Sequence, residues 1–129
     1  MITTGPSRGG YVTNVKFSNL VAQEGAVFQD GILVDASYRA ANPSCPPGWK
    51  PAAAPKMSDY SFTNIDGTDA TITGAAFHLK GGAANVVQRV TIENVHFAQG
   101  GWDCSNVTGT AKTGTITPWP PCPEIKVVA

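Results

Sequence analysis

The carboxylates that could act as a catalytic pair lie close together at one place in the sequence. Asp59, Asp66 and Asp69 surround the segment Asn64-Ile65-Asp66-Gly67. Two carboxylates on one surface can serve as general acid and general base. Asp-Gly is also a common turn sequence, because Asp bonds the backbone of its neighbours and Gly accepts unusual backbone angles. Turn formation is the interpretation that we favour for these residues.

The two histidines do not lie in a pattern that indicates a metal or catalytic site. His78 and His96 each alternate with apolar neighbours, in Phe77-His78-Leu79 and Val95-His96-Phe97. Alternation places both side chains on the polar face of a strand. No cysteine or carboxylate is spaced with either of them as a ligand set. The sequence therefore predicts solvated or hydrogen-bonded histidines and no metal or other cofactor.

The cysteines and a glycosylation sequon bear on the compartment of the protein. Cys104 and Cys122 lie in the turn-rich C-terminal segment. A disulfide between them would close a short loop and imply an oxidising compartment. Asn106-Val107-Thr108 is an N-glycosylation sequon, which fits secretion but occurs often by chance. Cys45 is left over, either free or with a partner outside the chain. No signal peptide is recognisable in the chain, so a secreted origin is not visible directly.

A pattern that occurs three times predicts the strands that position these residues. Each copy is apolar at alternate positions, as a strand with one buried face requires, and then carries an Asn followed by an aliphatic residue. The copies are Asn14–Leu20, Asp59–Ile65 and Arg89–Val95. We expect a bend at each of these asparagines, and we expect the three to stack as a structural ladder: Asn19, Asn64 and Asn94. Repeats with variable insertions predict a stacked solenoid, and the non-hairpin gaps resemble the coils of a parallel β-helix.

The rest of the chain reads as short strands and loops in an all-β fold without helical periodicity. Strands are expected at residues 11–21, 26–34 with a break at Asp30-Gly31, 57–65, 75–80, 86–98 and 115–117. Residues 36–55 contain five prolines and are predicted to form a loop excursion, since proline cannot donate to a sheet. Residues 102–129 are predicted to form a C-terminal cap and tail. The prediction is one partial domain over residues 1–129, with about three to four coils.

Composition excludes two classes of partner. The chain has 129 residues, of which 14% are charged, and its formal net charge is zero. No basic stripe is present to follow a phosphate backbone, so nucleic acid is not an expected partner. No apolar run approaches the roughly 20 residues of a membrane-spanning helix. Membrane insertion is therefore not expected either.

An ordered set of motifs links the chain to a known family. The motifs are Arg8-Gly9-Gly10-Tyr11, Tyr60-x-Phe62-x-Asn64-Ile65 and Trp102-x-Cys104-x-Asn106-Val107. In this order they resemble the polygalacturonases, the pectin-hydrolysing glycoside hydrolases, and most of all the plant-type members. The resemblance covers roughly residues 1 to 125. It implies a right-handed parallel β-helix, secretion to the cell wall, and inverting hydrolysis of α-1,4-galacturonan by one acid and one carboxylate that activates water.

The resemblance also identifies what this chain lacks. The family takes its catalytic aspartates from an Asn-Thr-Asp motif and an Asp-Asp pair, followed by Gly-His-Gly and Arg-Ile-Lys, and none of these four motifs occurs here. Met1 and Thr3 stand where the Arg and Lys are expected. Tyr38 matches a substrate-stacking tyrosine of the family; otherwise it packs on the Pro-rich loop. We therefore expect the C-terminal part of such an enzyme, with no pectin hydrolysis by the isolated chain.

Two hypotheses about function follow. The first is a polygalacturonase represented by its C-terminal coils, and the second is a non-catalytic β-solenoid that binds acidic polysaccharide or assembles with other chains. A solenoid needs a cap at each end. Trp102 and Trp119, with the Cys104–Cys122 bridge, are expected to cap the C-terminal end. Nothing in the sequence caps the N-terminal coil, so self-association through its open edge is expected.

Overall fold

The computed structural model describes residues 1–4, 9–36, 47–48 and 54–129, and every regular element within them is a β-strand. The strands are β1 (Ile2–Thr3), β2 (Tyr11–Val21), β3 (Val27–Phe28), β4 (Ile32–Asp35), β5 (Lys56–Gly67), β6 (Thr71–Ile72), β7 (Phe77–Lys80), β8 (Val87–Phe97), β9 (Trp102–Ser105), β10 (Val107–Lys112), β11 (Ile116–Thr117) and β12 (Ile125–Val128). The predicted all-β class is confirmed. No helix that could span a membrane occurs in the part of the chain that the structure describes.

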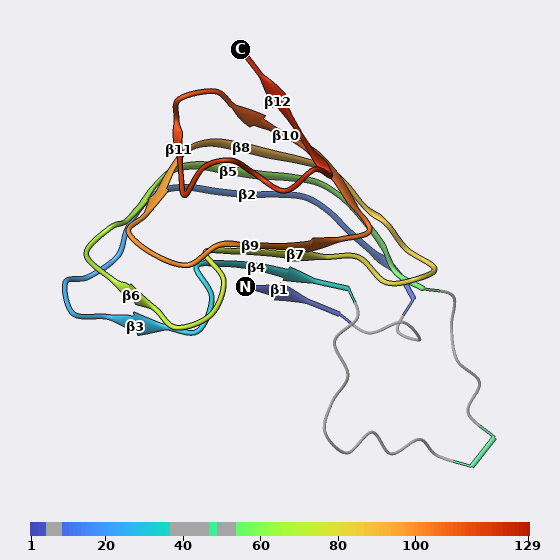
Figure 1. Ribbon diagram of the computed structural model, residues 1–129. Helices are drawn as coiled ribbons and strands as arrows, with labels where there is room; N and C mark the ends of the chain where they lie inside the picture. The colour runs from blue at the N-terminus through green and yellow to red at the C-terminus, as the bar shows by residue number, and fades with distance from the viewer. Residues whose placement is uncertain (5–8, 37–46, 49–53) are drawn as a thin grey trace.

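Three parallel sheets form the walls of a coiled structure (Figure 1). The first sheet has the order β1-β4-β7-β9, the second has the order β12-β10-β8-β5-β2, and the third contains β3 and β6. β11 pairs in parallel with β8. The chain passes from the second sheet through the third to the first, as β2-β3-β4 and again as β5-β6-β7. This path is that of a parallel β-helix, as predicted.

The three sequence copies stack in register along the second sheet. Residues at equal positions of β2, β5 and β8 pair with one another: Val15, Tyr60 and Val90; Phe17, Phe62 and Ile92; Leu20, Ile65 and Val95. The members in β5 and β8 are buried, while those in β2 are only partly covered. The rings of Phe17 and Phe62 stack with centroids 5.7 Å apart. Repeated apolar positions thus build one continuous core that runs along the coil axis.

The predicted bend at the asparagines is confirmed, and it lies inside the strands. Asn19, Asn64 and Asn94 have φ angles of 58°, 54° and 54°, and strand pairing continues beyond each of them. The sequence analysis missed a second left-handed residue at the start of each copy. These residues are Asn14, Asp59 and Arg89, with φ angles of 57°, 63° and 56°. Each repeat therefore bends twice. At both positions φ is positive, a conformation that Asn and Asp adopt at a lower free-energy cost than other non-glycine residues.

The C-terminal segment contains more strands than predicted. β9, β10 and β12 continue the first and second sheets, in addition to the expected strand at Ile116–Thr117. The predicted Cys104–Cys122 disulfide is present. The Trp102 ring stacks on Phe77 with centroids 3.9 Å apart, and its Nε1 donates a hydrogen bond to the carbonyl oxygen of Pro118 at 2.9 Å. Trp102 therefore covers the core of the last coils, as expected of a cap.

Candidate functional site

Polar and titratable side chains gather on the outer face of the first sheet. Alternation in β4 and β7 turns the apolar residues inward and leaves Asp35, His78 and Lys80 on the outside. The register pairs His78 with Asp103 of β9 and Lys80 with Asp35. Asp30, in the turn between β3 and β4, completes the group. We call these five residues the His78 cluster.

The imidazole of His78 lies among three carboxylates. Its Nδ1 is 3.8 Å from Oδ2 of Asp30 and 4.0 Å from Oδ2 of Asp103, and its Nε2 is 3.6 Å from Oδ2 of Asp35. These distances are longer than hydrogen bonds, so the contacts are electrostatic. The His78 side chain is 19% exposed, and Nε2 is buried without a hydrogen-bond partner among the described residues. His78 was predicted to be solvated or hydrogen-bonded, and the structure instead shows a mostly buried, charge-surrounded side chain.

Asp30 and Asp103 each have a further partner beside His78. Asp30 is only 10% exposed, and its Oδ1 accepts a hydrogen bond from the backbone N–H of Ala75 at 3.0 Å. Nζ of Lys80 forms an ion pair with Oδ2 of Asp103 at 2.8 Å, and both of these side chains remain partly exposed. With three carboxylates and one lysine, the His78 cluster is anionic when the imidazole is neutral. Protonation of His78 adds a second positive charge to this face.

The cluster does not present a free acid and base. An inverting hydrolase needs one carboxyl that can donate a proton and a second carboxylate that is free to activate water. However, Asp30 is nearly buried and bonded to the backbone, and Asp103 is paired with Lys80. The described residues hold one group with metal-ligand proximity, Cys104, Cys122 and Glu124, and its two sulfurs form the disulfide. Neither Asp30 nor Asp103 is therefore free to act as an acid or a base.

Asp59 and Asp66, two of the three carboxylates named from the sequence as a possible catalytic pair, have structural roles. Asp66 accepts hydrogen bonds from the hydroxyl and the backbone N–H of Thr68, at 2.6 and 3.0 Å, and these bonds lower the pKa of its carboxyl. Asp59 accepts two hydrogen bonds from Arg89, at 2.6 and 2.8 Å, which lower its pKa to about 2. Asp66 and Gly67 are the last residues of β5, and the turn follows them at Thr68 and Asp69, where the N–H of Ala70 donates to the carbonyl oxygen of Gly67 at 3.1 Å. The contact between Asp59 and Arg89 joins β5 to β8, and both residues have the positive φ found at the start of each copy.

The asparagine ladder is present, and His96 extends it. Nδ2 of Asn64 donates to Oδ1 of Asn19 at 3.1 Å, and Nδ2 of Asn94 donates to Oδ1 of Asn64 at 2.9 Å. His96 shares hydrogen bonds with Asn94 and Thr117, both at 3.1 Å. The prediction of a hydrogen-bonded strand histidine is confirmed for His96. The ladder is therefore a structural feature that joins the coils.

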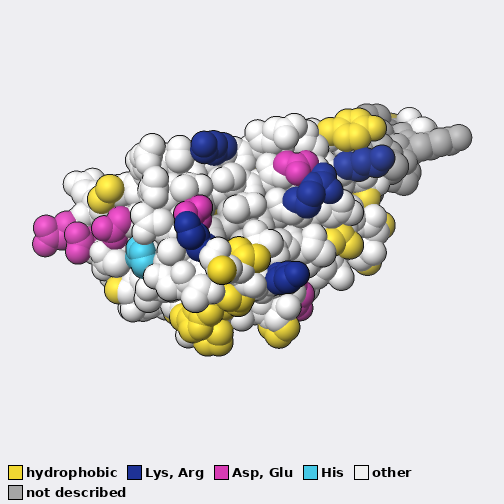
Figure 2. All heavy atoms as spheres, turned by 90° about the horizontal axis from the view of Figure 1, so that it is seen from above, with side chains coloured by type: hydrophobic (Ala, Val, Ile, Leu, Met, Phe, Trp, Pro, Cys, Tyr) yellow, Lys and Arg dark blue, Asp and Glu magenta, His cyan; other side chains and the backbone are white. Residues whose placement is uncertain are grey.

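The surface seen from the side of β8, β10 and β12 has no continuous basic stripe. Figure 2 shows Lys and Arg side chains next to Asp and Glu on this face. The ion pairs Arg89–Asp59 and Lys112–Glu93, with N–O distances of 2.6 Å, account for this mixing. A mixed surface of this kind does not favour a polyphosphate backbone.

Of the other predicted site residues, Asn106 lies in the part of the chain that the structure describes. Tyr38 and Cys45 lie outside the described residues, as does most of the predicted loop excursion. Asn106 is exposed and follows β9 with a φ of 48°. Its glycosylation stays a prediction.

Similarity to known proteins agrees with the fold. A family model described as glycosyl hydrolases family 28 matches residues 1–115. The chain belongs to this family. Membership confirms the resemblance to polygalacturonase-type glycoside hydrolases. No curated protein and no solved structure matches the chain. The disulfide of this family 28 chain fits an oxidising compartment, because such bonds persist outside the cytosol.

The His78 cluster is the group that sequence reasoning missed. His78 and Asp103 are far in the sequence from Asp30 and Asp35, and parallel stacking of β4, β7 and β9 brings the four residues together. The usable signal was a polar residue between apolar neighbours in each of these strands, at Asp35, His78 and Asp103. Reading it required the register of the coils, which the long insertion at residues 36–55 obscures.

Proposed function

We propose that this chain supplies substrate-binding coils of a polygalacturonase-type glycoside hydrolase that acts on α-1,4-galacturonan in pectin, and that it contains no acid–base pair of its own. The observation that carries the proposal is the family 28 match over residues 1–115. Two further observations support it. The four catalytic motifs of the resemblance are absent from the sequence, and the carboxylates Asp30 and Asp103 of the His78 cluster are already partnered.

The outer face of the first sheet is the proposed binding surface. Galacturonan is a polyanion, so its carboxylates need cationic partners. Lys80 is 31% exposed and lies at the surface of the cluster. Protonated His78 would reduce the repulsion from the three aspartates. Tyr38, soon after β4 in the sequence, is proposed to stack on a sugar ring.

Secretion to the cell wall is part of the same proposal. The Cys104–Cys122 disulfide and the exposed sequon at Asn106 both fit the secretory route. Expression in a glycosylating host, followed by removal of N-glycans, should lower the mass of the protein if Asn106 is used.

The test combines binding and hydrolysis. The purified chain is run in native gels that contain polygalacturonate or neutral dextran, and the release of reducing ends from polygalacturonate is measured in parallel. We expect retardation by polygalacturonate only, with no new reducing ends. Release of reducing ends would overturn the assignment of a non-catalytic role, and a lack of retardation would overturn the assignment of binding.

A matched pair of variants locates the binding face. Lys80→Gln and Lys112→Gln each remove one partly exposed lysine from an ion pair with a carboxylate, on the first and the second sheet respectively. Lys80→Gln should reduce the retardation severalfold, and Lys112→Gln should leave it unchanged. Equal effects would indicate general charge attraction instead of a site on the first sheet.

The second candidate is a non-catalytic solenoid that binds acidic polysaccharides of any kind. The absence of the catalytic motifs from the sequence favours it. Retardation by alginate as strong as that by polygalacturonate would support this candidate over a galacturonan-specific surface.

A further inference from the structure

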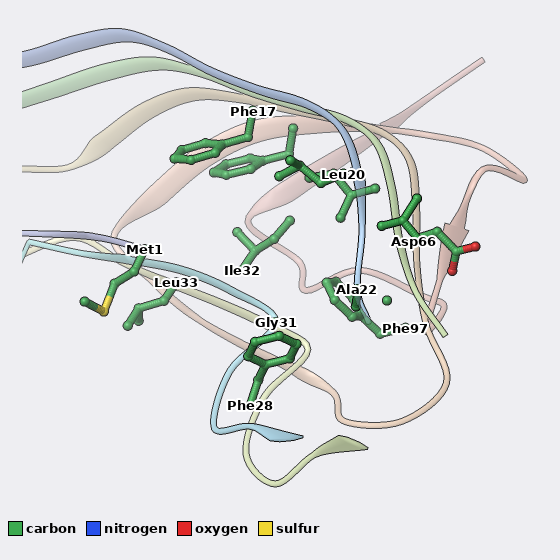
Figure 3. A pocket seen from close by; sticks show the side chains of 14 residues that line it. Met1, Phe17, Leu20, Ala22, Phe28, Gly31, Ile32, Leu33, Asp66 and Phe97 are labelled. Carbon is green, nitrogen blue, oxygen red and sulfur yellow. The ribbon is translucent and has the colours of Figure 1, made fainter. Parts of the chain in front are cut away.

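A pocket and a group of metal-ligand side chains lie outside the His78 cluster, and their chemistry differs. The pocket has a volume of about 260 Å³ and an almost entirely apolar lining (Figure 3). Asp66 is the one ionisable side chain among the described residues that line it, so no set of polar groups there selects a particular ligand. The group of Cys104, Cys122 and Glu124 is different, because thiolates and carboxylates are ligands of zinc.

The donor atoms of this group are close enough to bind one ion. The sulfurs of Cys104 and Cys122 and a carboxylate oxygen of Glu124 all lie within 4.8 Å of one another. In a tetrahedral zinc site, bonds of about 2.3 Å to sulfur and about 2.0–2.2 Å to oxygen separate the ligand atoms by roughly 3.5–3.8 Å. Two thiolates and one carboxylate would leave the fourth position to water. The disulfide excludes the ion while it is present, because its sulfurs are bonded to each other.

Contacts other than the disulfide hold the two cysteines in place. Cys104 belongs to β9, which pairs in parallel with β7 of the first sheet. The neighbouring Trp102 stacks on Phe77 and donates a hydrogen bond to the carbonyl oxygen of Pro118, which ties β9 to the segment that leads to the second cysteine. Both cysteines are partly buried and pack against the hydrophobic core. Reduction of the disulfide should therefore leave the two thiols side by side.

A turn places Glu124 beside Cys122. The N–H of Ile125 donates to the carbonyl oxygen of Cys122 at 3.0 Å, which closes a turn through Pro123 and Glu124. Ile125 is buried at the start of β12, where it pairs with Gly109 of β10. A core residue thus anchors the turn to the second sheet. The carboxylate should stay close to the thiols after reduction.

We infer that the reduced form of this chain binds one Zn²⁺ through Cys104, Cys122 and Glu124, and that the disulfide and the metal ion are alternative states of one site. A dithiol breaks the S–S bond and is itself oxidised to a disulfide, and its two electrons and two protons leave both sulfurs of the chain as thiols. Binding of Zn²⁺ then releases the two thiol protons, because thiolates are the ligands. This inference is independent of the proposed binding of galacturonan.

The test compares the reduced chain with the oxidised chain. Dithiothreitol reduces the disulfide and is removed under nitrogen, and Co²⁺ is then titrated, followed by Zn²⁺. We expect one equivalent of Co²⁺ to give thiolate-to-cobalt charge-transfer absorption in the reduced chain only, and one equivalent of Zn²⁺ to remove it. Zn²⁺ should also raise the Tm of the reduced chain, because the folded form binds it more tightly than the unfolded form. The Tm of the oxidised chain should not change.

Matched variants assign the ligands. Cys122→Ser should abolish the charge-transfer absorption. Glu124→Gln should weaken Zn²⁺ binding by at least about tenfold, since even residues that only support a ligand contribute that much to metal affinity. Glu93→Gln changes a glutamate that is paired with Lys112 on the second sheet, and it should leave the affinity unchanged.

Each contrary result decides against the inference. Failure of the reduced chain to take up either metal would overturn it, as would equal affinity in the wild type and Glu124→Gln. Equal uptake by the oxidised chain would place the ion at another site. Circular dichroism follows the β-sheet signal, and its loss on reduction would also contradict the inference, because the thiols would then lack the framework that holds them together.

Discussion

Asn64 is the central member of the asparagine ladder, and its replacement separates the hydrogen bonds of the ladder from its backbone conformation. Asn64→Gly keeps the left-handed φ of 54° available but removes the bonds to Asn19 and Asn94. Two exposed hydrogen bonds at the lower end of the usual range contribute about 1–1.5 kcal/mol together. Asn64→Ala removes the same bonds and adds about 1 kcal/mol, because alanine is strained in the left-handed region. We therefore expect losses of about 1–1.5 and about 2–2.5 kcal/mol.

The assay is reversible unfolding by urea and by heat, with Asn14→Gly as the matched control. Asn14 has a φ of 57°, and its side chain donates to Thr13 at only 3.4 Å. This control should change the free energy of unfolding by less than about 0.5 kcal/mol. For a chain of this size, 1 kcal/mol corresponds to a shift in Tm of about 3–5 °C. The reasoning is refuted if Asn64→Gly is as stable as Asn14→Gly, or if Asn64→Ala is no less stable than Asn64→Gly.

Three further predictions follow from the contacts between coils. Replacing Cys104 and Cys122 by serine should lower the free energy of unfolding by about 3 kcal/mol, measured in urea, since the disulfide closes a short loop; an unchanged midpoint would count against this. Burial raises the pKa of Tyr60, whose hydroxyl donates to a backbone carbonyl at 2.6 Å, to about 12. The folded state thus resists ionisation, and its stability should be full below pH 10 and fall between pH 10 and about 12, with Tyr60→Phe removing this loss. The hydrogen bonds from Arg89 lower the pKa of Asp59 from 3.8 to about 2, so their contribution should persist above pH 3.8 and disappear as the pH falls through about 2. Carboxyl NMR titration of Arg89→Gln should show a higher pKa for Asp59, and an unchanged value would contradict the assignment.

The repeats made most of the fold predictable. Alternation in the three copies located β2, β5 and β8, and the asparagine at a fixed place in each copy gave both the bend and the ladder. β9, β10 and β12 were missed because each is only four to six residues long, which is too short for alternation to be recognised, and β10 also contains Gly109 and two threonines. In these strands the stacking of one coil on the next, and not local propensity, decides the conformation.

The candidate site was much less predictable than the fold. His78 could be placed on a polar face from its apolar neighbours, but its surroundings depend on which strands stack beside β7. Asp30, Asp35 and Asp103 approach it only after three coils have formed. The left-handed Arg89 was also unforeseen, since its conformation accompanies an ion pair with Asp59 on the neighbouring coil.

Residue-resolved NMR with a galacturonate oligomer tests the central claim most directly, because one sample reports both binding and hydrolysis. If the chain supplies substrate-binding coils without an acid–base pair, the oligomer should change the amide chemical shifts of Asp35, His78, Lys80 and Asp103 on the first sheet. No new anomeric signal from cleaved substrate should appear. New anomeric signals would contradict the non-catalytic assignment. An absence of shifts, or shifts confined to the second sheet, would contradict the proposed binding face.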